Sequence, residues 1–319
     1  MLCSGQIEVA MNGIELRPMQ ASDRAEVAEL IQLSTNTWYQ THGRPRLFSR
    51  GPEAAALFFD VYERLDPGCG VVAVSEYSGR LAGSCFYHPR PTHVSLGIMN
   101  VHPNYFGSGA ARVLLQYVID FAEHQEKPLR LVSSAMNLDS YSLYTRAGFV
   151  PQVVFQDLIL PVPPEGLPHR TPGDETVREA VAADVPAIDR LETELVGISR
   201  PQDYRYFLEN REGLWHVSVY PNERGGLDGF LASLGHPGFT MLGPGLARTA
   251  EQAAALLLAE LDRCRGRVPL FLVPAQCSAL VQQMYRWGAK NCEIHFSQVR
   301  GRCPPARGIQ MPTFLPESG

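Results

Sequence analysis

A proline-rich segment near the middle of the chain, residues 160–175 ("LPVPPEGLPHRTPGDE"), constrains the fold more than any other feature of the sequence. It contains five prolines and two glycines, and its few apolar residues follow neither a helical nor a strand period. Proline lacks the backbone N–H donor that regular elements need, so this composition is typical of an extended linker. Because a chain of 319 residues exceeds the usual size of one domain, we expect one folded module on each side of the linker.

Composition and charge exclude several classes of protein. Apolar residues make up 45% of the chain and charged residues 19%, which is typical of a folded globular protein. The net charge is −5 and no basic run occurs, so we expect no nucleic-acid partner, which would need clustered Lys and Arg. The sequence has neither 18 consecutive apolar residues nor a basic start followed by an apolar core. We therefore expect a cytoplasmic protein with no membrane association.

The cysteines are scattered and form no C-x-x-C pair, so we expect reduced thiols, no disulfide framework and no metal. There are seven of them: Cys3, Cys69, Cys85, Cys264, Cys277, Cys292 and Cys303.

Hydrophobic periodicity predicts a mixed α/β layer before the linker. Three consecutive strands should form an antiparallel meander, with helices on the faces of the sheet. The predicted helices span residues 22–33, 52–65, 110–127 and 138–147, and the predicted strands span 70–77, 80–88, 93–101, 129–135 and 153–160. A polar loop is expected between the first two helices, over residues 34–50.

The second half of the chain repeats this pattern. Residues 176–188 echo residues 15–27, with Arg178 six residues before Asp184 as Arg17 is six before Asp23. Two later helical segments also align with the first half: residues 254–261 lie on 112–119 at an offset of 142, and residues 278–289 lie on 138–149 at an offset of 140. We therefore predict a duplicated architecture. Its parts are an N-terminal extension (1–13), a first domain (14–160), the linker (161–175) and a second domain (176–319).

The stretch "VHPNYFGSGAARVLL" (101–115) predicts a strand that passes through two glycines into a helix. The first N–H groups of a helix lack partners and carry partial positive charge, so this end attracts anions. Gly107 and Gly109 would let main-chain N–H groups approach a pyrophosphate closely, and Ser108 could add a hydroxyl. A lone G-x-G is also compatible with a purely structural turn. No Gly-Lys-Ser/Thr follows, and no acidic residue stands where a dinucleotide fold needs one, so neither of those sites fits.

The same stretch resembles the acyl-CoA pyrophosphate loop of the GNAT superfamily of N-acyltransferases, Gln/Arg-x-x-Gly-x-Gly/Ala after a Val-x-Pro strand end. Its six positions here are Phe106, Gly107, Ser108, Gly109, Ala110 and Ala111. Phe106 replaces the usual Arg or Gln and has no side-chain donor, so only the main-chain N–H groups would bind the pyrophosphate. A second segment, "NLDSYSLYTRAGF" (137–149), resembles the family's other signature, Asn-x-x-Ala/Ser-x-x-Leu-Tyr-x-x-x-Gly-Phe. The positions that match it are Asn137, Ser140, Leu143, Tyr144, Gly148 and Phe149.

This resemblance implies a mostly antiparallel mixed sheet and an acyl-pantetheine arm lying between the fourth and fifth strands. The backbones of Met99 and Val101 would then bond the arm. Asn137 would hold the cofactor through its amide, or would simply cap a helix.

Acyl transfer from a thioester to an amine needs a neutral amine, donors for the developing oxyanion and a proton for the departing thiolate. Tyr144 suits the last role, since a phenol with an ordinary pKa near 10 is protonated at neutral pH; a tyrosine packed in the core is the alternative. His88, His93 and Asn100 lie near strand ends as candidate bases, and we assign none of them.

The expected activity is transfer of an acetyl group from acetyl-CoA to a primary amine of a small molecule or peptide, and transfer from another acyl-CoA with a longer chain is a close variant. A non-catalytic acyl-CoA-binding sensor or scaffold is the alternative. Acceptor contacts are expected from the segment after the first helix, whose side chains could instead anchor their own loop. These candidates are Asn36, Trp38, Tyr39 and His42.

The second domain is expected to have lost this chemistry. At the offset of 142, Thr249, Glu251 and Ala253 replace Gly107, Gly109 and Ala111, and a glutamate would repel a phosphate. At the offset of 140, Met284 replaces Tyr144. Such a degenerate GNAT-like domain would serve packing, homodimer formation or acceptor recognition. Residues 308–319 would form a final strand or a tail that reaches the first domain.

Overall fold

The computed structural model describes residues 13–316, and their contacts divide the chain into two compact units. Unit 1 comprises residues up to 89, then 94–129, with a short piece that starts at Leu315. Unit 2 comprises residues 90–93 and 130–314. All but the last residue of the predicted N-terminal extension lies outside the described residues.

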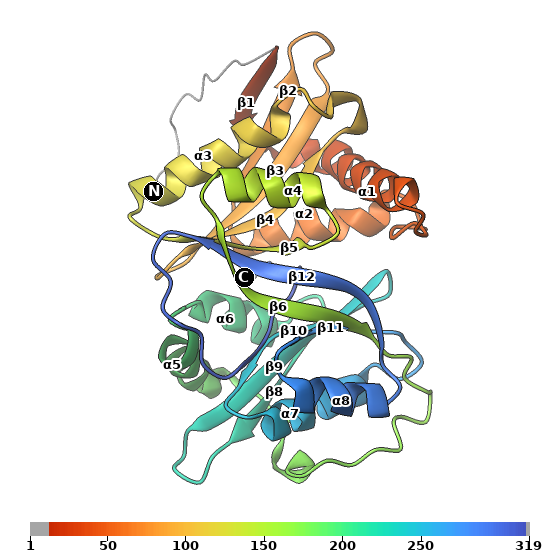
Figure 1. Cartoon of the computed structure of the whole chain (residues 1–319), viewed down its shortest axis with the longest axis vertical. Coiled ribbons are helices and arrows are strands. Elements are labelled where there is room, and N and C mark those ends of the chain that lie inside the picture. The colour runs from red at the N-terminus through yellow and green to blue at the C-terminus, as the bar shows by residue number, and fades with distance from the viewer. Residues whose placement is uncertain (1–12, 317–319) are drawn as a thin grey trace. The chain divides into compact units, whose positions relative to one another are not determined.

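Unit 1 is an antiparallel sheet in the order β1-β2-β3-β4 with helices on both faces (Figure 1). The predicted meander is confirmed. The elements are β1 (Ile14–Pro18), η1 (Ala21–Asp23), α1 (Arg24–Thr41), α2 (Glu53–Leu65), β2 (Gly70–Ser75), β3 (Leu81–Pro89), β4 (Val94–Val101), η2 (Pro103–Tyr105) and α3 (Ala110–His124).

Strand β3 shows why helices cover both faces of this sheet. Successive side chains of a strand point to opposite faces, and β3 is buried along almost its whole length. The ring of Phe86 packs on Tyr62 of α2, with centroids 4.8 Å apart. The neighbouring Tyr87 packs on Phe121 of α3, also at 4.8 Å. Helices α2 and α3 therefore cover opposite faces of the sheet.

Helix α1 is longer than the sequence analysis predicted. The helix was expected to end at residue 33, but it continues to Thr41, so much of the expected loop is helical. No glycine or proline occurs between Arg24 and Thr41, and the Thr41 hydroxyl donates to the carbonyl of Thr37 within the helix. Gly43, with a φ of +71°, is the first residue suited to ending it. Strand β1, at the start of unit 1, was not predicted either.

Unit 2 contains a mixed sheet in the order β5-β12-β6-β11-β10-β9-β8-β7. All neighbours with a defined register are antiparallel except β10 and β11, which are parallel. The elements are β5 (Leu129–Ser134, whose first residue belongs to unit 1), α4 (Leu138–Arg146), β6 (Val150–Ile159), η3 (Asp174–Thr176), β7 (Arg178–Glu179), η4 (Ala182–Asp184), α5 (Val185–Val196), α6 (Pro201–Glu209), β8 (Trp215–Pro221), β9 (Leu227–His236), β10 (Phe239–Ala247), α7 (Ala250–Arg263), β11 (Leu270–Pro274), α8 (Ser278–Arg286), β12 (Lys290–Arg300) and β13 (Ile309–Met311).

Strands from the two halves of the sequence interleave in this sheet. Strand β6 precedes the linker but lies between β11 and β12, which follow it. Strand β12 in turn lies between β5 and β6. The antiparallel ladder of β6 and β12 runs from Ile159 opposite Lys290 to Val150 opposite Val299. The domain limits at residues 160 and 176 therefore remain a prediction about the repeated sequence, since unit 2 contains strands from both sides of the linker.

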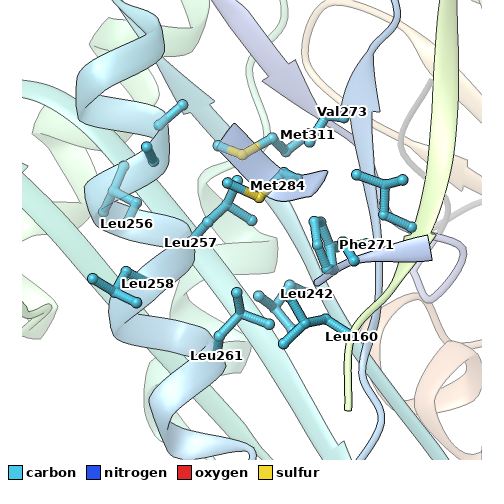
Figure 2. Close-up of a cluster of buried hydrophobic side chains, with 14 of the residues drawn as sticks. Leu160, Leu242, Leu256, Leu257, Leu258, Leu261, Phe271, Val273, Met284 and Met311 are labelled. Carbon is cyan, nitrogen blue, oxygen red and sulfur yellow. The ribbon is translucent and has the colours of Figure 1, made fainter. Parts of the chain in front are cut away.

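The main core of unit 2 also joins residues from both sides of the linker (Figure 2). Leu256, Leu257 and Leu261 of α7 pack over the sheet with Phe271 of β11 and Leu160, which follows β6. All five side chains are at most 1% exposed. Each contributes roughly 1.5–3 kcal/mol by burial, so this cluster stabilises the interleaved arrangement.

The predicted duplication is confirmed by a motif that the structure builds twice. Arg17 donates to both carboxylate oxygens of Asp23, at 2.7 and 2.8 Å, and Asp23 accepts from the backbone N–H of Gln20 at 2.8 Å. Arg178 donates to both oxygens of Asp184 at 2.8 Å, and Asp184 accepts from a backbone N–H at 2.9 Å. In both places the motif joins an edge strand to the helix that follows it.

The helices also follow the duplication, with one correction to the predicted offsets. Helix α8 begins 140 residues after α4, as predicted, and α7 also begins 140 residues after α3. The predicted offset of 142 for the second pair was wrong. The leucine-rich sequence of α7 is apolar around much of the helix and therefore fits α3 in more than one register.

We expect Asp184→Asn to lower the free energy of unfolding by about 1–2 kcal/mol at pH 7, because Arg178 loses a charged acceptor. The hydrogen bonds from Arg178 lower the pKa of Asp184 in the folded state. The stabilisation is therefore present above the carboxyl's unfolded pKa and disappears as the pH falls through the folded pKa. Urea unfolding should show a difference from wild type at pH 7 that shrinks below about pH 4. Glu175→Gln, at an exposed carboxylate, is the control, and an equal loss in both variants would contradict the assignment.

Candidate functional site

The predicted glycine turn joins β4 to α3 in unit 1. After the strand, His102 Nδ1 accepts a hydrogen bond from the N–H of Asn104 at 3.1 Å, and Pro103 occupies the first position of the short helix η2. The chain then turns through Gly107 and Gly109, whose φ angles are +77° and +97°. Only glycine adopts this left-handed region without strain, so the sequence dictates the turn at these two positions.

The main-chain N–H groups of this turn are only partly used. Ser108 N donates to the carbonyl of Tyr105 at 3.1 Å, and Ala110 N donates to Ser108 Oγ at 3.3 Å. No side chain caps α3, and the N–H groups of Gly107, Gly109 and Ala111 make no hydrogen bond to any described residue. Three donors therefore remain at the positive end of a helix, where an anion binds favourably.

The strand that leads into the turn becomes less buried toward its end. Residues 94–97 of β4 are buried, whereas residues 98–101 are half-buried, and these include Met99 and Val101. Met99 pairs with Cys85 of β3 and Val101 pairs with Gly83. The predicted backbone partners of the pantetheine arm thus lie directly before the turn. Phe106 is 56% exposed, Ala110 is buried and Ala111 is half-buried.

The second signature lies in unit 2, on α4. Asn137 caps this helix, because its Oδ1 accepts from the N–H of Ser140 at 3.1 Å, as the alternative interpretation of this residue expected. Tyr144 is 8% exposed, and its ring lies edge-on to Phe149 with centroids 5.7 Å apart. Because the two signatures belong to different units, their assembly into one site stays a prediction.

The four predicted acceptor residues lie in the last turns of α1 or just beyond it. Asn36 is buried and clamps the following loop, donating to the carbonyl of Phe48 and accepting from its N–H, both at 3.0 Å. Trp38 stacks on His42 at 4.3 Å between centroids and lies edge-on to Tyr39 at 5.2 Å. Asn36 therefore positions the loop, and the three aromatic side chains form a partly exposed group.

The candidate bases are mostly inaccessible. His88 is 1% exposed, and its Nδ1 lies 2.6 Å from the carboxylate of Asp66. His93 is 2% exposed. Asn100 of β4 donates to Ser34 Oγ at 2.7 Å, and its buried Oδ1 has no hydrogen-bond partner among the described residues. None of the three has the exposed basic group that would take a proton from a substrate.

The corresponding turn of the second half is closed. Only Arg248 separates β10 from Thr249, the residue that caps α7. Thr249 Oγ1 accepts from Gln252 N at 3.3 Å, and the Gln252 side chain accepts from Thr249 N at 3.1 Å. This capping box uses two of the N-terminal donors internally, the N–H groups of Thr249 and Gln252. The helix starts also correct the predicted alignment: Thr249 corresponds to Gly109, and Glu251 corresponds to Ala111.

The chain's own C-terminal strand lies beside the fourth strand of the second half. Strands β10 and β11 pair at Met241 and Leu270, and further along β10 its partner is β13. Met311 of β13 pairs with Gly245 and is buried in the main core (Figure 2). A Cβ atom on Gly243 would lie 2.5 Å from the carbonyl oxygen of Pro312, so the strands are closely packed. Residues 309–311 therefore form a final strand, one of the two predicted alternatives.

Part of the first half is similar to known proteins. The profile of the acetyltransferase (GNAT) family matches residues 28–149. UPF0157 protein YqkA of Bacillus subtilis (strain 168) is 39% identical over 72 residues, 23% of this chain and 21% of that protein. The match thus spans about a fifth of that curated relative.

Solved structures share the fold along nearly the whole chain. A proposed acetyltransferase from Pyrococcus horikoshii has a TM-score of 0.74 at 14% identity, covering 98% of this chain and 99% of that one. A GCN5-related N-acetyltransferase from Sphaerobacter thermophilus has a TM-score of 0.64 at 17% identity, covering 94% and 99%. A tandem GNAT protein from the clavulanic acid biosynthesis pathway has a TM-score of 0.58 at 16% identity, covering 90% and 98%.

No helix within residues 13–316 is long and apolar enough to cross a bilayer. The glycine turn, the second signature and the family profile all lie in the first half, and the fold is shared over both halves. Residues 28–149 therefore match the GNAT acetyltransferase family, and over both halves the chain has the fold of two GNAT-like domains in tandem.

Proposed function

We propose that this protein transfers an acetyl group from acetyl-CoA to a primary amine, by direct attack within a ternary complex, and that the first half of the chain carries the chemistry. The observation that carries this proposal is the glycine turn between β4 and α3. Its three unbonded N–H groups match the chemistry of a pyrophosphate, which needs several donors around adjacent anionic oxygens.

The second half supports the proposal by contrast. The capping box occupies the N–H of Thr249, the residue that corresponds to Gly109, and so removes one of the donors that a pyrophosphate would need. In the GNAT resemblance the pantetheine arm lies between the fourth and fifth strands, and β13 fills that position beside β10. We therefore assign one acetyl-CoA to each chain, in the first half, and a structural or recognition role to the second.

The reaction requires little of the protein beyond positioning and one proton. A neutral amine attacks the thioester carbonyl and forms the new carbon–nitrogen bond, the carbon–sulfur bond breaks, and its electron pair leaves on the thiolate. The thiolate takes one proton and the acylated nitrogen releases one, so the protons balance. We assign that proton to Tyr144, because a phenol with an ordinary pKa near 10 stays protonated at neutral pH and can protonate a thiolate. No base is assigned, so an acceptor amine that is already neutral at the working pH fits best.

A non-catalytic sensor that binds acyl-CoA is the second candidate function. The absence of an exposed basic group among His88, His93 and Asn100 favours it. Release of free thiol from acetyl-CoA in the presence of a panel of amines separates the two. An enzyme releases thiol with at least one amine class, whereas a sensor releases none although it binds acetyl-CoA.

We expect Gly107→Ala to weaken acetyl-CoA binding about tenfold or more, because the added methyl group keeps the pyrophosphate from approaching the main-chain N–H groups closely. A tenfold loss of affinity corresponds to only about 1.4 kcal/mol. Gly68→Ala is a matched control, because Gly68 has a φ of +75° against +77° for Gly107, and neither has an atom within 4 Å of an added Cβ. Both variants should lose about 1–2 kcal/mol of stability from left-handed backbone strain. Calorimetric titration with acetyl-CoA measures the difference, and equal affinity in both variants would contradict the assigned turn.

We expect Tyr144→Phe to lower kcat on the order of 100-fold while the KM for acetyl-CoA stays near its wild-type value. The phenylalanine keeps the packing against Phe149 and removes only the hydroxyl. Tyr141→Phe is the control on the same helix, where the ring packs on Phe296. Thiol release should separate the two variants, and unchanged turnover in Tyr144→Phe would remove the assignment of this residue as the general acid.

A further inference from the structure

A cluster of three titratable side chains lies where the two halves of the sequence interleave in unit 2. Asp157 belongs to β6, and Glu293 and His295 belong to β12. Asp157 pairs directly with Glu293 in the ladder, and His295 is two residues further along β12, so their side chains share one face of the sheet. One oxygen or nitrogen from each residue lies within 4.8 Å of the other two.

Two polar atoms of this cluster are buried without a hydrogen bond. Asp157 is 2% exposed, and its Oδ1 has no partner among the described residues. His295 Nδ1 lies 2.8 Å from Asp157 Oδ2, close enough for an ion pair, but the two are not aligned as a hydrogen bond. A buried polar atom without a partner costs about 1–3 kcal/mol, so the arrangement points to a missing ligand.

The cluster also differs in its charge balance from two other buried carboxylates of unit 2, those of Glu192 and Asp203. Glu192 pairs with Arg200 at 2.6 Å, and Asp203 pairs with Arg90 at 2.8 Å, so each has a permanent cation. Within residues 13–316 Asp157 has an ion pair with His295 and with no Arg or Lys. A second carboxylate, that of Glu293, stands beside it, and a divalent cation would balance both charges.

We propose that Asp157, Glu293 and His295 bind a divalent cation. Two carboxylate oxygens and one imidazole nitrogen suit Zn²⁺ or Mn²⁺ and leave a further position for water. The Ser134 hydroxyl donates to Glu293 Oε1 and orients that carboxylate from outside the ligand set. Because the ligands come from β6 and β12, the cation cross-links strands from opposite sides of the linker and stabilises their pairing. The expectation of no metal rested on local spacing, which cannot detect ligands so far apart in the sequence.

The test uses the full-length protein, stripped with EDTA and then supplied with Zn²⁺ or, separately, Mn²⁺. After gel filtration, elemental analysis should find about one Zn²⁺ per chain. The melting temperature should rise with either ion and fall again with EDTA, because an ion that binds only the folded state stabilises it. Mn²⁺ prefers oxygen ligands to thiols, so its effect on the melting temperature separates this site from the cysteine thiols.

Variants of the cluster test whether the ion binds there. Asp157→Asn keeps the shape of the side chain but removes its negative charge, and it should weaken metal binding about tenfold or more. His216→Gln is the control, because His216 also pairs with a buried carboxylate in unit 2, that of Glu260 at 2.7 Å. The exposed Glu179 lies 3.6 Å from the other ring nitrogen of His216, but these three residues do not form a group of mutually close ligand atoms. Circular dichroism checks that Asp157→Asn folds, and His295→Gln replaces it if it does not. The proposal is overturned if the stripped wild-type chain takes up neither ion, or if the folded cluster variant binds as much metal as His216→Gln.

Discussion

The main-chain ladder between β6 and β12 is the interaction on which the rest of unit 2 depends. Each of these strands also has a second neighbour, β11 for β6 and β5 for β12. Without the ladder, the sheet would have buried backbone N–H and C=O groups without partners, which folded proteins avoid. The sheet is therefore complete only when strands from both sides of the proline-rich linker are present. The same ladder brings Asp157 beside Glu293 and lets Tyr141 of α4 pack on Phe296 of β12.

The two halves of the duplicated fold differ where the fourth strand meets the following helix. In the first half this connection contains η2 and the glycine turn, which leaves three N–H groups unbonded. In the second half it is a single residue, Arg248, followed by a capping box. The Arg–Asp motif at the start of each half has the same geometry in both halves, because it stabilises the connection between the first strand and the first helix of each half. This divergence falls at the part that would bind a ligand, which supports assigning acetyl-CoA to one half.

Much of this fold could be predicted from the sequence, because it depends on local signals. Apolar periodicity located α2 and β2 to β5, and the equal Arg–Asp spacing located the repeat. The end of α1 was missed because Ser and Thr are weak helix formers, yet their hydroxyls bond within the helix here. The partners of β6 and β12 could not be predicted, since periodicity identifies a strand but not its neighbour. The cluster around Asp157 depends on that pairing and was invisible for the same reason.

The glycine turn was predictable because left-handed φ angles and a helix start leave a clear sequence pattern. The occupied position beside β10 in the second half was not predictable, because it is filled by β13, which lies far along the chain. Hydrogen–deuterium exchange with and without acetyl-CoA tests whether the cofactor binds at the turn of the first half alone. Acetyl-CoA should slow exchange in a peptide spanning residues 104–115 and leave a peptide spanning residues 245–256 unchanged. Unchanged exchange in the first peptide, or protection of the second, would contradict that assignment.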